Sequence, residues 1–174
     1  MCCKRRHWRA DLRATLLAAL PPTPCNTPFE RIDRTTLIIG GSGFLGAELV
    51  RQACAAGRPT AATYATRPGD TSHAVWNPLD LRDHDRLDAP ADEVRPRLIV
   101  NTSSGGVDWA ATAKGPTHLA MIAAKNRVRM VHVSTDAVFS GADINYNEAA
   151  LPDPNTPYSA AKAAAETGIL AAPC

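Results

Sequence analysis

A tyrosine and a lysine lie four residues apart near the end of the chain, at Tyr158 and Lys162. On a helix this spacing places the phenol and the ammonium on one face. A positive charge beside a phenol lowers its pKa, so the tyrosine can pass a proton near neutral pH. The pair therefore indicates acid–base chemistry. The alternative is an ordinary tyrosine and a solvated lysine, since such pairs are common.

Three glycines, Gly40, Gly43 and Gly46, follow the apolar residues 36–39 and precede a stretch with helical periodicity. Between a strand and a helix, such glycines allow a tight turn, let backbone approach a pyrophosphate and let the helix pack closely on the sheet. The N–H groups that begin the helix would face the phosphates. The pattern predicts a dinucleotide-binding loop. The alternative is a glycine-rich loop without a ligand.

Two hydroxyl side chains, Ser134 and Thr135, stand at the end of an apolar run and precede Asp136. Ligands collect at the carboxyl ends of strands in open parallel sheets, which makes this a third candidate. A cluster that only caps the strand end would have the same residues. His132, between two valines of the same run, is interpreted as a packed core histidine.

These residues need a scaffold, and strands and helices alternate from residue 36 onward. The expected strands cover residues 36–39, 60–64, 73–76, 97–101 and 130–134. The expected helices cover residues 44–56, 82–94 with a break at Pro90, 116–126, and 158 to the end of the chain. Because the strands show no alternation of polar and apolar residues, we expect an α/β fold: a Rossmann-type, doubly wound parallel sheet covered on both faces.

Length and composition limit the function. The 174 residues, 45% of them hydrophobic and 21% charged, suit one soluble domain. A net charge of +2 and the lack of a long apolar run favour neither a nucleic-acid nor a membrane partner. No pair of the five cysteines has metal-ligand spacing, so we expect no metal site and a reducing, cytoplasmic setting. Cys54 is expected to be a small buried thiol.

Residues 1–34 do not resemble the start of a domain, because a short apolar patch is followed by a proline-rich stretch. A basic start suggests a signal peptide, but Asp11 and Arg13 interrupt the pattern. We therefore predict a disordered or mis-assigned extension over residues 1–34. The NAD(P)-binding domain is expected over residues 35–174.

Together the motifs resemble the extended short-chain dehydrogenase/reductases, and within them the dTDP-4-dehydrorhamnose reductase branch, which reduces sugar nucleotides. The resemblance covers about residues 35–170, the cofactor half of such an enzyme. It rests on the glycine pattern, Asp80-Leu81, Asn101, the run STDAVFSG at 134–141, and Tyr158-x-x-x-Lys162. Family members continue with a further strand and a smaller substrate domain. The resemblance therefore implies that this chain is incomplete at its C-terminus and lacks the substrate domain.

The resemblance also implies roles for individual residues. Tyr158 would give a proton to a substrate carbonyl, and Lys162 would bind the nicotinamide ribose and tune Tyr158. Thr135 would bond the reacting oxygen, with Ser134 as the substitute. The glycines would hold the pyrophosphate, and Asp80 with Leu81 would contact the adenine. The full set implied to bind cofactor is Gly40, Ser42, Gly43, Phe44, Leu45, Gly46, Arg67, Asp80, Leu81, Asn101, Thr102 and Lys162.

The choice of cofactor has evidence of its own in the sequence. NAD sites usually place a carboxylate after the second strand, where it holds the ribose 2′-hydroxyl. Here the residues after that strand offer Arg67, and no acid before Asp70. A guanidinium matches a 2′-phosphate, so we expect NADP, with NAD as the alternative.

The leading hypothesis is NADPH-dependent reduction of a keto-sugar nucleotide, with the proton from Tyr158 and possible assembly as a homodimer. A second hypothesis is an NAD-dependent sugar epimerase or dehydratase of the same superfamily. A third is a non-catalytic dinucleotide-binding or regulatory protein. The third is favoured by the early end of the chain and by residues 114–118, which lack an asparagine usual in the family. The intact set of Thr135, Tyr158 and Lys162 argues for an enzyme.

Overall fold

The computed structural model describes residues 35–70, 72 and 74–173. Five parallel strands form one sheet in the order β3-β2-β1-β4-β5. The strands are β1 (Thr36–Ile39), β2 (Thr60–Tyr64), β3 (Val75–Pro78), β4 (Leu98–Asn101) and β5 (Arg129–His132). The predicted Rossmann-type parallel sheet is thus confirmed. The N-terminal extension expected at 1–34, the terminal cysteines and His73 lie outside the described residues.

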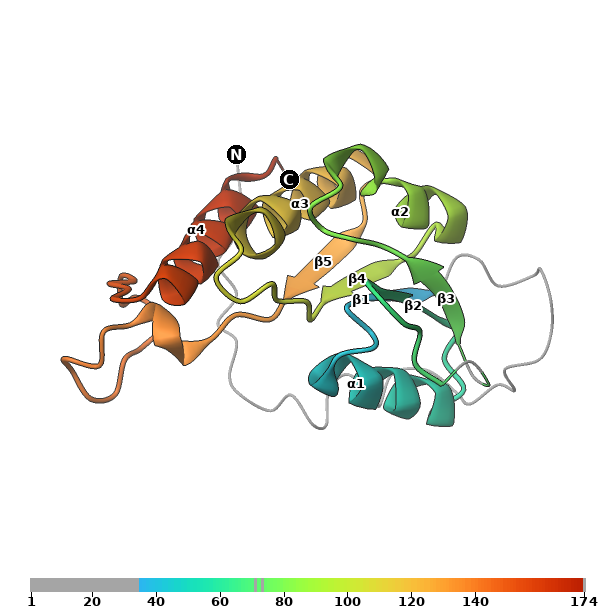
Figure 1. Cartoon of the computed structure of the whole chain (residues 1–174), viewed down its shortest axis with the longest axis horizontal. Coiled ribbons are helices and arrows are strands. Elements are labelled where there is room, and N and C mark those ends of the chain that lie inside the picture. The colour runs from blue at the N-terminus through green and yellow to red at the C-terminus, as the bar shows by residue number, and fades with distance from the viewer. Residues whose placement is uncertain (1–34, 71, 73, 174) are drawn as a thin grey trace.

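Helices lie on both sides of this sheet (Figure 1). They are α1 (Phe44–Ala55), α2 (Ala89–Val94), α3 (Gly115–Lys125) and α4 (Pro157–Ala171). Figure 1 shows α1 on one side and α2, α3 and α4 on the other. Short 3-10 turns cover His84–Arg86 and Asp136–Val138, and a π-helical turn covers Ala110–Lys114.

Successive side chains of β1, the central strand, pack alternately into two separate hydrophobic cores. Ile38 belongs to a small cluster with Val50 and Cys54 of α1, so Cys54 is buried as expected. Leu37 belongs to the larger cluster, which includes Leu119 of α3. Because side chains alternate across a strand, one apolar run serves both faces of the sheet.

Two boundaries in the middle of the chain differ from the expectation. The third strand is Val75–Pro78 rather than 73–76. Pro78 is tolerated because β3 is the last strand at its edge of the sheet, where a missing N–H costs little. The helix expected over 82–94 is instead a 3-10 turn followed by α2. Pro90 does not break a helix but lies in the first turn of α2, where the backbone N–H has no intrahelical partner in any case.

The helix expected over 116–126 begins earlier. Its helical residues start in the π-helical turn Ala110–Lys114, and α3 ends at Lys125. Oδ1 of Asp108 accepts hydrogen bonds from the backbone N–H of Ala110 (2.9 Å) and of Ala111 (3.2 Å), which caps this start. Gly115, the first residue of α3, lies very close to Leu81. A Cβ at this position would come within 2.7 Å of the Leu81 Cβ, so the close packing requires glycine. Apolar periodicity carries no information about such a cap, so it did not predict the earlier start of this helix.

Helices lie on both sides of the sheet as expected, but they do not cover the two faces equally. Val131 of β5 is in register with Val100 and, through it, with Ile38 on the α1 side. Val131 is 42% exposed, and helix α1 contacts β1 and β2. Among the described residues, no helix covers β4 and β5 on that side.

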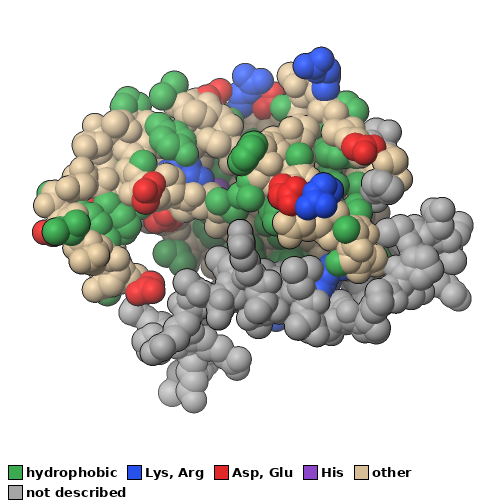
Figure 2. Space-filling model, turned by 90° about the horizontal axis from the view of Figure 1, so that it is seen from below, with side chains coloured by type: hydrophobic (Ala, Val, Ile, Leu, Met, Phe, Trp, Pro, Cys, Tyr) green, Lys and Arg blue, Asp and Glu red, His purple; other side chains and the backbone are tan. Residues whose placement is uncertain are grey.

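The described surface shows how charged and apolar groups are distributed. On the face seen in Figure 2, lysine and arginine side chains are scattered and form no basic patch among the described residues. No helix in the part of the chain that the structure describes is long and apolar enough to cross a membrane. The same residues hold no cluster of three or more metal-binding side chains.

Candidate active site

Three strand ends meet at one edge of the sheet. Ile39 of β1 is in register with Asn101 of β4, which is in register with His132 of β5. The chain leaves these positions into the glycine loop, the turn that starts at Thr102, and the segment that carries Ser134 and Thr135. Since all strands are parallel, the three motifs are neighbours although they are far apart in sequence.

The glycine loop has the geometry that its pattern predicts. Gly40 has a φ of 75°, in the left-handed region, and a Cβ there would lie 2.9 Å from the Cα of Ser103. A Cβ on Gly46 would lie 2.2 Å from the carbonyl oxygen of Gly40. Both positions therefore need glycine, one for its backbone conformation and both for close approach. Gly43 is the N-cap of α1 and has an ordinary φ of −77°.

Two threonines tie the loop to its neighbours. The backbone N–H of Gly40 donates to Oγ1 of Thr63 (3.1 Å) on β2. The hydroxyl of Thr102 donates to the carbonyl of Ile39 (2.9 Å), with a longer contact to the carbonyl of Gly40 (3.3 Å). Thr102 was expected to bind cofactor; the structure shows that its hydroxyl holds the loop in place.

The start of α1 offers backbone donors. No side chain caps it, and its first turn carries no acidic residue. Phe44 is fully exposed and Leu45 is 41% exposed, so apolar side chains border these donors. Unpaired N–H groups at a helix start, beside a turn too crowded for side chains, fit the pyrophosphate of a dinucleotide.

A cavity of about 230 Å³ lies beside the glycine loop. Its walls include Gly40, Tyr64, Asp80 and Leu81, so the structure brings the predicted adenine residues together with the loop. Arg67 is exposed and is not among the lining residues. At this end of β2 the cavity is lined instead by Tyr64, the last residue of the strand, and by Ala65, neither of which was predicted as a site residue.

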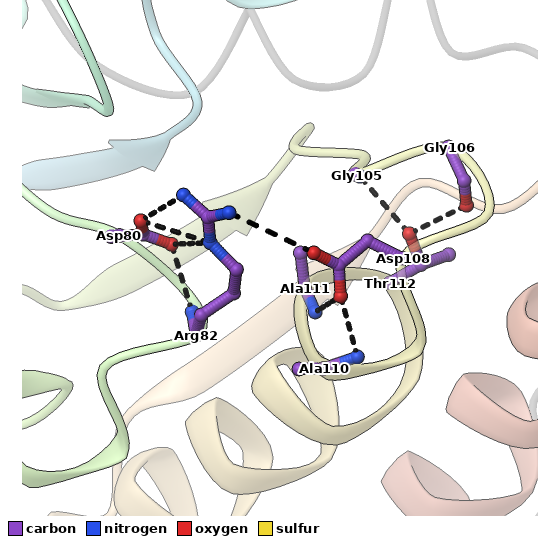
Figure 3. A network of polar contacts seen from close by, with 8 residues as sticks. All are labelled: Asp80, Arg82, Gly105, Gly106, Asp108, Ala110, Ala111 and Thr112. Carbon is purple, nitrogen blue, oxygen red and sulfur yellow. Dashed lines mark hydrogen bonds and ion pairs between the residues drawn. The ribbon is translucent and has the colours of Figure 1, made fainter.

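One wall of this cavity carries a polar network, drawn in Figure 3. Arg82 donates to both carboxylate oxygens of Asp80, with Nη2 2.6 Å from Oδ2, and its Nη1 lies 3.9 Å from Oδ2 of Asp108. These hydrogen bonds from Arg82 lower the pKa of the Asp80 carboxyl. Asp80 therefore lines the site as a carboxylate already engaged by Arg82, and Asp108 joins it to the capped helix start.

The predicted hydroxyl residues lie at the end of β5. Oγ1 of Thr135 accepts from the backbone N–H of Ala137 (3.2 Å) and caps the 3-10 turn Asp136–Val138. The same hydroxyl donates to the carboxylate of Asp136 (3.3 Å). Oγ of Ser134 is buried and has no hydrogen-bond partner among the described residues. Thr135 thus caps the turn that follows the strand, while the Ser134 hydroxyl stays without a partner among the described residues.

Helix α4 places Tyr158 one turn before Lys162, as the spacing predicts. Lys162 is 2% exposed, and its Nζ donates to the carbonyl of Val133 (2.6 Å) at the end of β5. Burial lowers the pKa of Lys162, while the charge of Glu166 acts in the opposite direction. The alternative of a solvated lysine is therefore wrong: the ammonium group is directed into the strand ends.

His132 corrects its interpretation as a packed core histidine. It is the last residue of β5, partly buried, and both ring nitrogens have polar partners. Nδ1 lies 3.0 Å from Nδ2 of Asn101, and Nε2 lies 3.2 Å from Nζ of Lys162. The sequence held one signal for this role, since a strand ending at His132 would place it beside Asn101. The expected strand ended two residues later.

A parallel sheet with a glycine turn after its central strand, and a cavity beside that turn, defines a Rossmann-type nucleotide-binding domain. More particularly, the chain belongs to the family described as RmlD substrate binding domain, which matches residues 34–174. This confirms the resemblance to the dTDP-4-dehydrorhamnose reductase branch of the extended short-chain dehydrogenase/reductases.

Two curated relatives agree with this family. The chain is 31% identical over 145 residues to a dTDP-4-keto-6-deoxy-D-glucose reductase of Streptomyces niveus, covering 77% of this chain and 46% of the relative. It is 31% identical over 147 residues to a dTDP-4-dehydrorhamnose reductase of Mycobacterium tuberculosis, covering 78% of this chain and 45% of the relative. The chain therefore spans about half the length of the curated relatives it matches.

Solved structures show the same fold. A hypothetical dTDP-4-dehydrorhamnose reductase from Sulfolobus tokodaii has a TM-score of 0.67 and 30% identity, over 77% of this chain and 51% of that one. The Bordetella bronchiseptica enzyme WbmG, solved in complex with NAD and UDP, has a TM-score of 0.72 and 21% identity, over 80% of this chain and 50% of that one. The second likeness shows the fold alone.

Proposed function

We propose that this chain is the cofactor-binding half of a sugar-nucleotide reductase that reduces a keto-sugar nucleotide with NADPH. The observation that carries the proposal is the placement of Lys162. It is buried one turn after Tyr158 and directed into the strand ends that also hold the glycine loop. The family and both curated reductases support this class of substrate.

The residues present fit a nicotinamide dinucleotide. Gly40 and Gly46 leave no room for side chains because neighbouring backbone approaches them closely, and the uncapped start of α1 offers N–H donors for a pyrophosphate. Asp80 and Leu81 would border the adenine, and Lys162 would bond the nicotinamide ribose. When bound, the reduced cofactor supplies the hydride for a carbonyl carbon. Tyr158 would then give its phenolic proton to the carbonyl oxygen, so that the product is an alcohol.

NADPH remains the expected cofactor because the residues after β2 offer Arg67 and no acid before Asp70. Since Arg67 is exposed and outside the cavity wall, it would have to turn toward a 2′-phosphate at the rim. NAD is the alternative. We further propose that the protein acts in the cytoplasm and can form homodimers.

Cofactor binding can be tested at Gly43, which is an N-cap with an ordinary backbone conformation. Gly43→Asp keeps a good capping residue but puts a negative charge where the pyrophosphate would bind, so we expect loss of NADPH binding by at least about tenfold. The measurement is a fluorescence titration with NADPH and NADH. Gly43→Ser, which caps without charge, is the control. Arg67→Ala should reduce the preference for NADPH over NADH.

Equal binding by the wild-type chain and by Gly43→Asp would show that the glycine loop does not hold the cofactor. Binding of NADH in preference to NADPH, unaffected by Arg67→Ala, would contradict the choice of cofactor only.

Catalysis can be tested by oxidation of NADPH after addition of a dTDP-linked 4-keto sugar. Tyr158→Phe removes the proposed proton donor and keeps the ring, so we expect turnover to fall by about 10²–10⁴-fold while cofactor binding is retained. If the chain binds NADPH but Tyr158→Phe leaves turnover unchanged, Tyr158 is not the acid. If it binds NADPH and the wild type never oxidises it with such sugars, the proposal that this chain by itself carries out the reduction is wrong.

A further inference from the structure

Trp76, on the edge strand β3, contacts two loops beside the proposed cofactor site. It is in register with Ala62 of β2 and, through Ala62, with Ile38 of β1, which directs its side chain to the face of the sheet that α1 covers. The indole is partly buried and packs against the core cluster that contains these two residues. Trp76 is not among the residues that line the cavity. Its contacts are with the backbone around the cavity rather than with the cavity itself.

The glycine loop is one of the two segments that the indole contacts. A Cβ on Gly41 would lie 2.7 Å from the Cβ of Ala62 and 3.2 Å from Cζ3 of Trp76. Gly41 is buried, so the backbone of the loop lies directly on the ring. Because protein interiors are close-packed, a change in the ring is transmitted to this backbone. The indole thus supports the loop one residue after the turn at Gly40.

The loop that follows β2, residues 65–70, is the other segment. A Cβ on Gly69 would come within 2.6 Å of Cη2 and 2.7 Å of Cζ2 of Trp76, so this backbone also lies against the ring. The indole Nε1–H donates to the carbonyl of Asp70 (2.9 Å). Oδ1 of Asp70 in turn accepts from the backbone N–H of Ser72 (2.9 Å). Trp76 therefore holds the end of this loop both by packing and by a hydrogen bond.

Arg67 lies in the middle of this loop. The loop starts from β2, which is paired with β3 up to its last residue, Tyr64. It ends at Gly69, which Trp76 holds. Holding both ends of so short a loop removes backbone freedom from the residues between them. The backbone of Arg67 is therefore confined, although its side chain is exposed.

We propose that Trp76 is a positioning residue for Arg67 and thereby contributes to the choice of NADPH over NADH. This rests on the proposed function, in which Arg67 turns toward the 2′-phosphate. An arginine that binds phosphate loses conformational freedom, and a loop that is already ordered has less freedom to lose. Because NADH has no 2′-phosphate, the advantage applies to NADPH alone.

The test is a titration with NADPH and with NADH, followed by the fluorescence of the bound cofactor. Trp76→Phe removes Nε1 and shortens the ring but keeps an aromatic residue in the core. We expect the preference for NADPH, measured as the ratio of the two dissociation constants, to fall by about three- to tenfold through weaker NADPH binding. Trp109→Phe makes the same change at a tryptophan that is 47% exposed and precedes the π-helical turn, and it should keep the wild-type ratio.

Two further variants separate positioning from a purely structural role. If Trp76 acts through Arg67, Trp76→Phe should change the ratio no further once Arg67→Ala is present. A purely structural role would weaken the binding of both cofactors alike, and it would persist in the double variant. Gly69→Ala leaves the core residues unchanged, but its methyl group would meet the indole, so it should lower the ratio as Trp76→Phe does. This variant carries the test if Trp76→Phe fails to fold.

Hydrogen exchange without cofactor distinguishes this proposal from the proposed function. In Trp76→Phe, peptides that cover residues 65–70 should exchange faster than in the wild type and in Trp109→Phe, whereas peptides from α3 should not. If the wild type binds neither cofactor, the proposed function fails and with it the effect on cofactor choice, while the exchange result still decides whether Trp76 orders this loop.

Three results would overturn the proposal. The first is unchanged exchange of residues 65–70 in Trp76→Phe. The second is a wild-type ratio in both Trp76→Phe and Gly69→Ala. The third is a ratio that Trp76→Phe lowers equally with and without Arg67→Ala, because the effect would then not pass through the arginine.

Discussion

At the scale of single residues, the site depends on ionisable side chains whose polar atoms are engaged. Lys162 is buried and contacts His132 and the carbonyl of Val133, whereas Asp80 is partly exposed and is engaged by Arg82. A charged group is costly to bury unless it is paired, so the surroundings of Lys162 and His132 restrict the protonation states that the folded chain can hold. Stability should consequently depend on pH through these residues.

His132 gives the clearest pH dependence. Its pKa falls from an ordinary 6.5 to about 4 in the folded chain, so between these values the unfolded chain binds more protons. The stability contributed by neutral His132 is fully present above pH 6.5 and is lost as the pH falls toward 4. We expect a loss on the order of 2 kcal/mol over this window, measured by urea unfolding.

His132→Gln removes the titrating group, so its unfolding free energy should fall less steeply across the same pH window. His118→Gln is the control and should keep the wild-type slope. Parallel slopes for wild type and His132→Gln would mean that His132 is not neutral in the folded chain under these conditions.

At the scale of elements, helix α4 brings Tyr158 and Lys162 to the strand ends. Its first turn is fixed by a capping box: Oγ1 of Thr156 accepts from the N–H of Ser159 (3.2 Å), and Oγ of Ser159 accepts from the N–H of Thr156 (3.0 Å). Tyr158 lies within this turn. The position of the proposed proton donor therefore depends on the cap as well as on the helix.

Loss of the cap should destabilise the chain. Thr156→Ala removes the side-chain acceptor, and we expect a loss of about 1 kcal/mol in the free energy of unfolding. Hydrogen exchange at the first turn of α4 should become faster. Thr156→Ser keeps the hydroxyl and should stay close to the wild type. Unchanged exchange in Thr156→Ala would show that packing alone fixes this turn.

At the scale of the whole molecule, the sheet is supported unequally. One face is covered by α2 and α3 through the larger core, whereas α1 covers only part of the other face. Val131 of β5 is exposed on that second face. The described residues thus form a candidate cofactor site beside a sheet whose β5 strand is little covered on that face. The chain spans about half the length of the curated relatives it matches.

The order of the elements, the parallel sheet, and the need for glycine at positions 40 and 46 could be predicted from the sequence. These depend on local properties: apolar periodicity reports burial, and glycine spacing reports a turn between a strand and a helix. Tyr158 and Lys162 on one helix face are local in the same sense. Boundaries set by caps and by proline, as at Asp108 and Pro90, were less well predicted.

Contacts between residues that lie far apart along the chain could not be predicted in this way. Asn101, His132 and Lys162 are separated by 31 and 30 residues along the chain, and their contact depends on the register of β4 with β5 and on the packing of α4. The engagement of Asp80 by Arg82 and the distance of Arg67 from the cavity wall likewise follow from side-chain placement. Sequence patterns specify the faces of single elements, whereas hydrogen bonds between elements depend on how these faces are brought together.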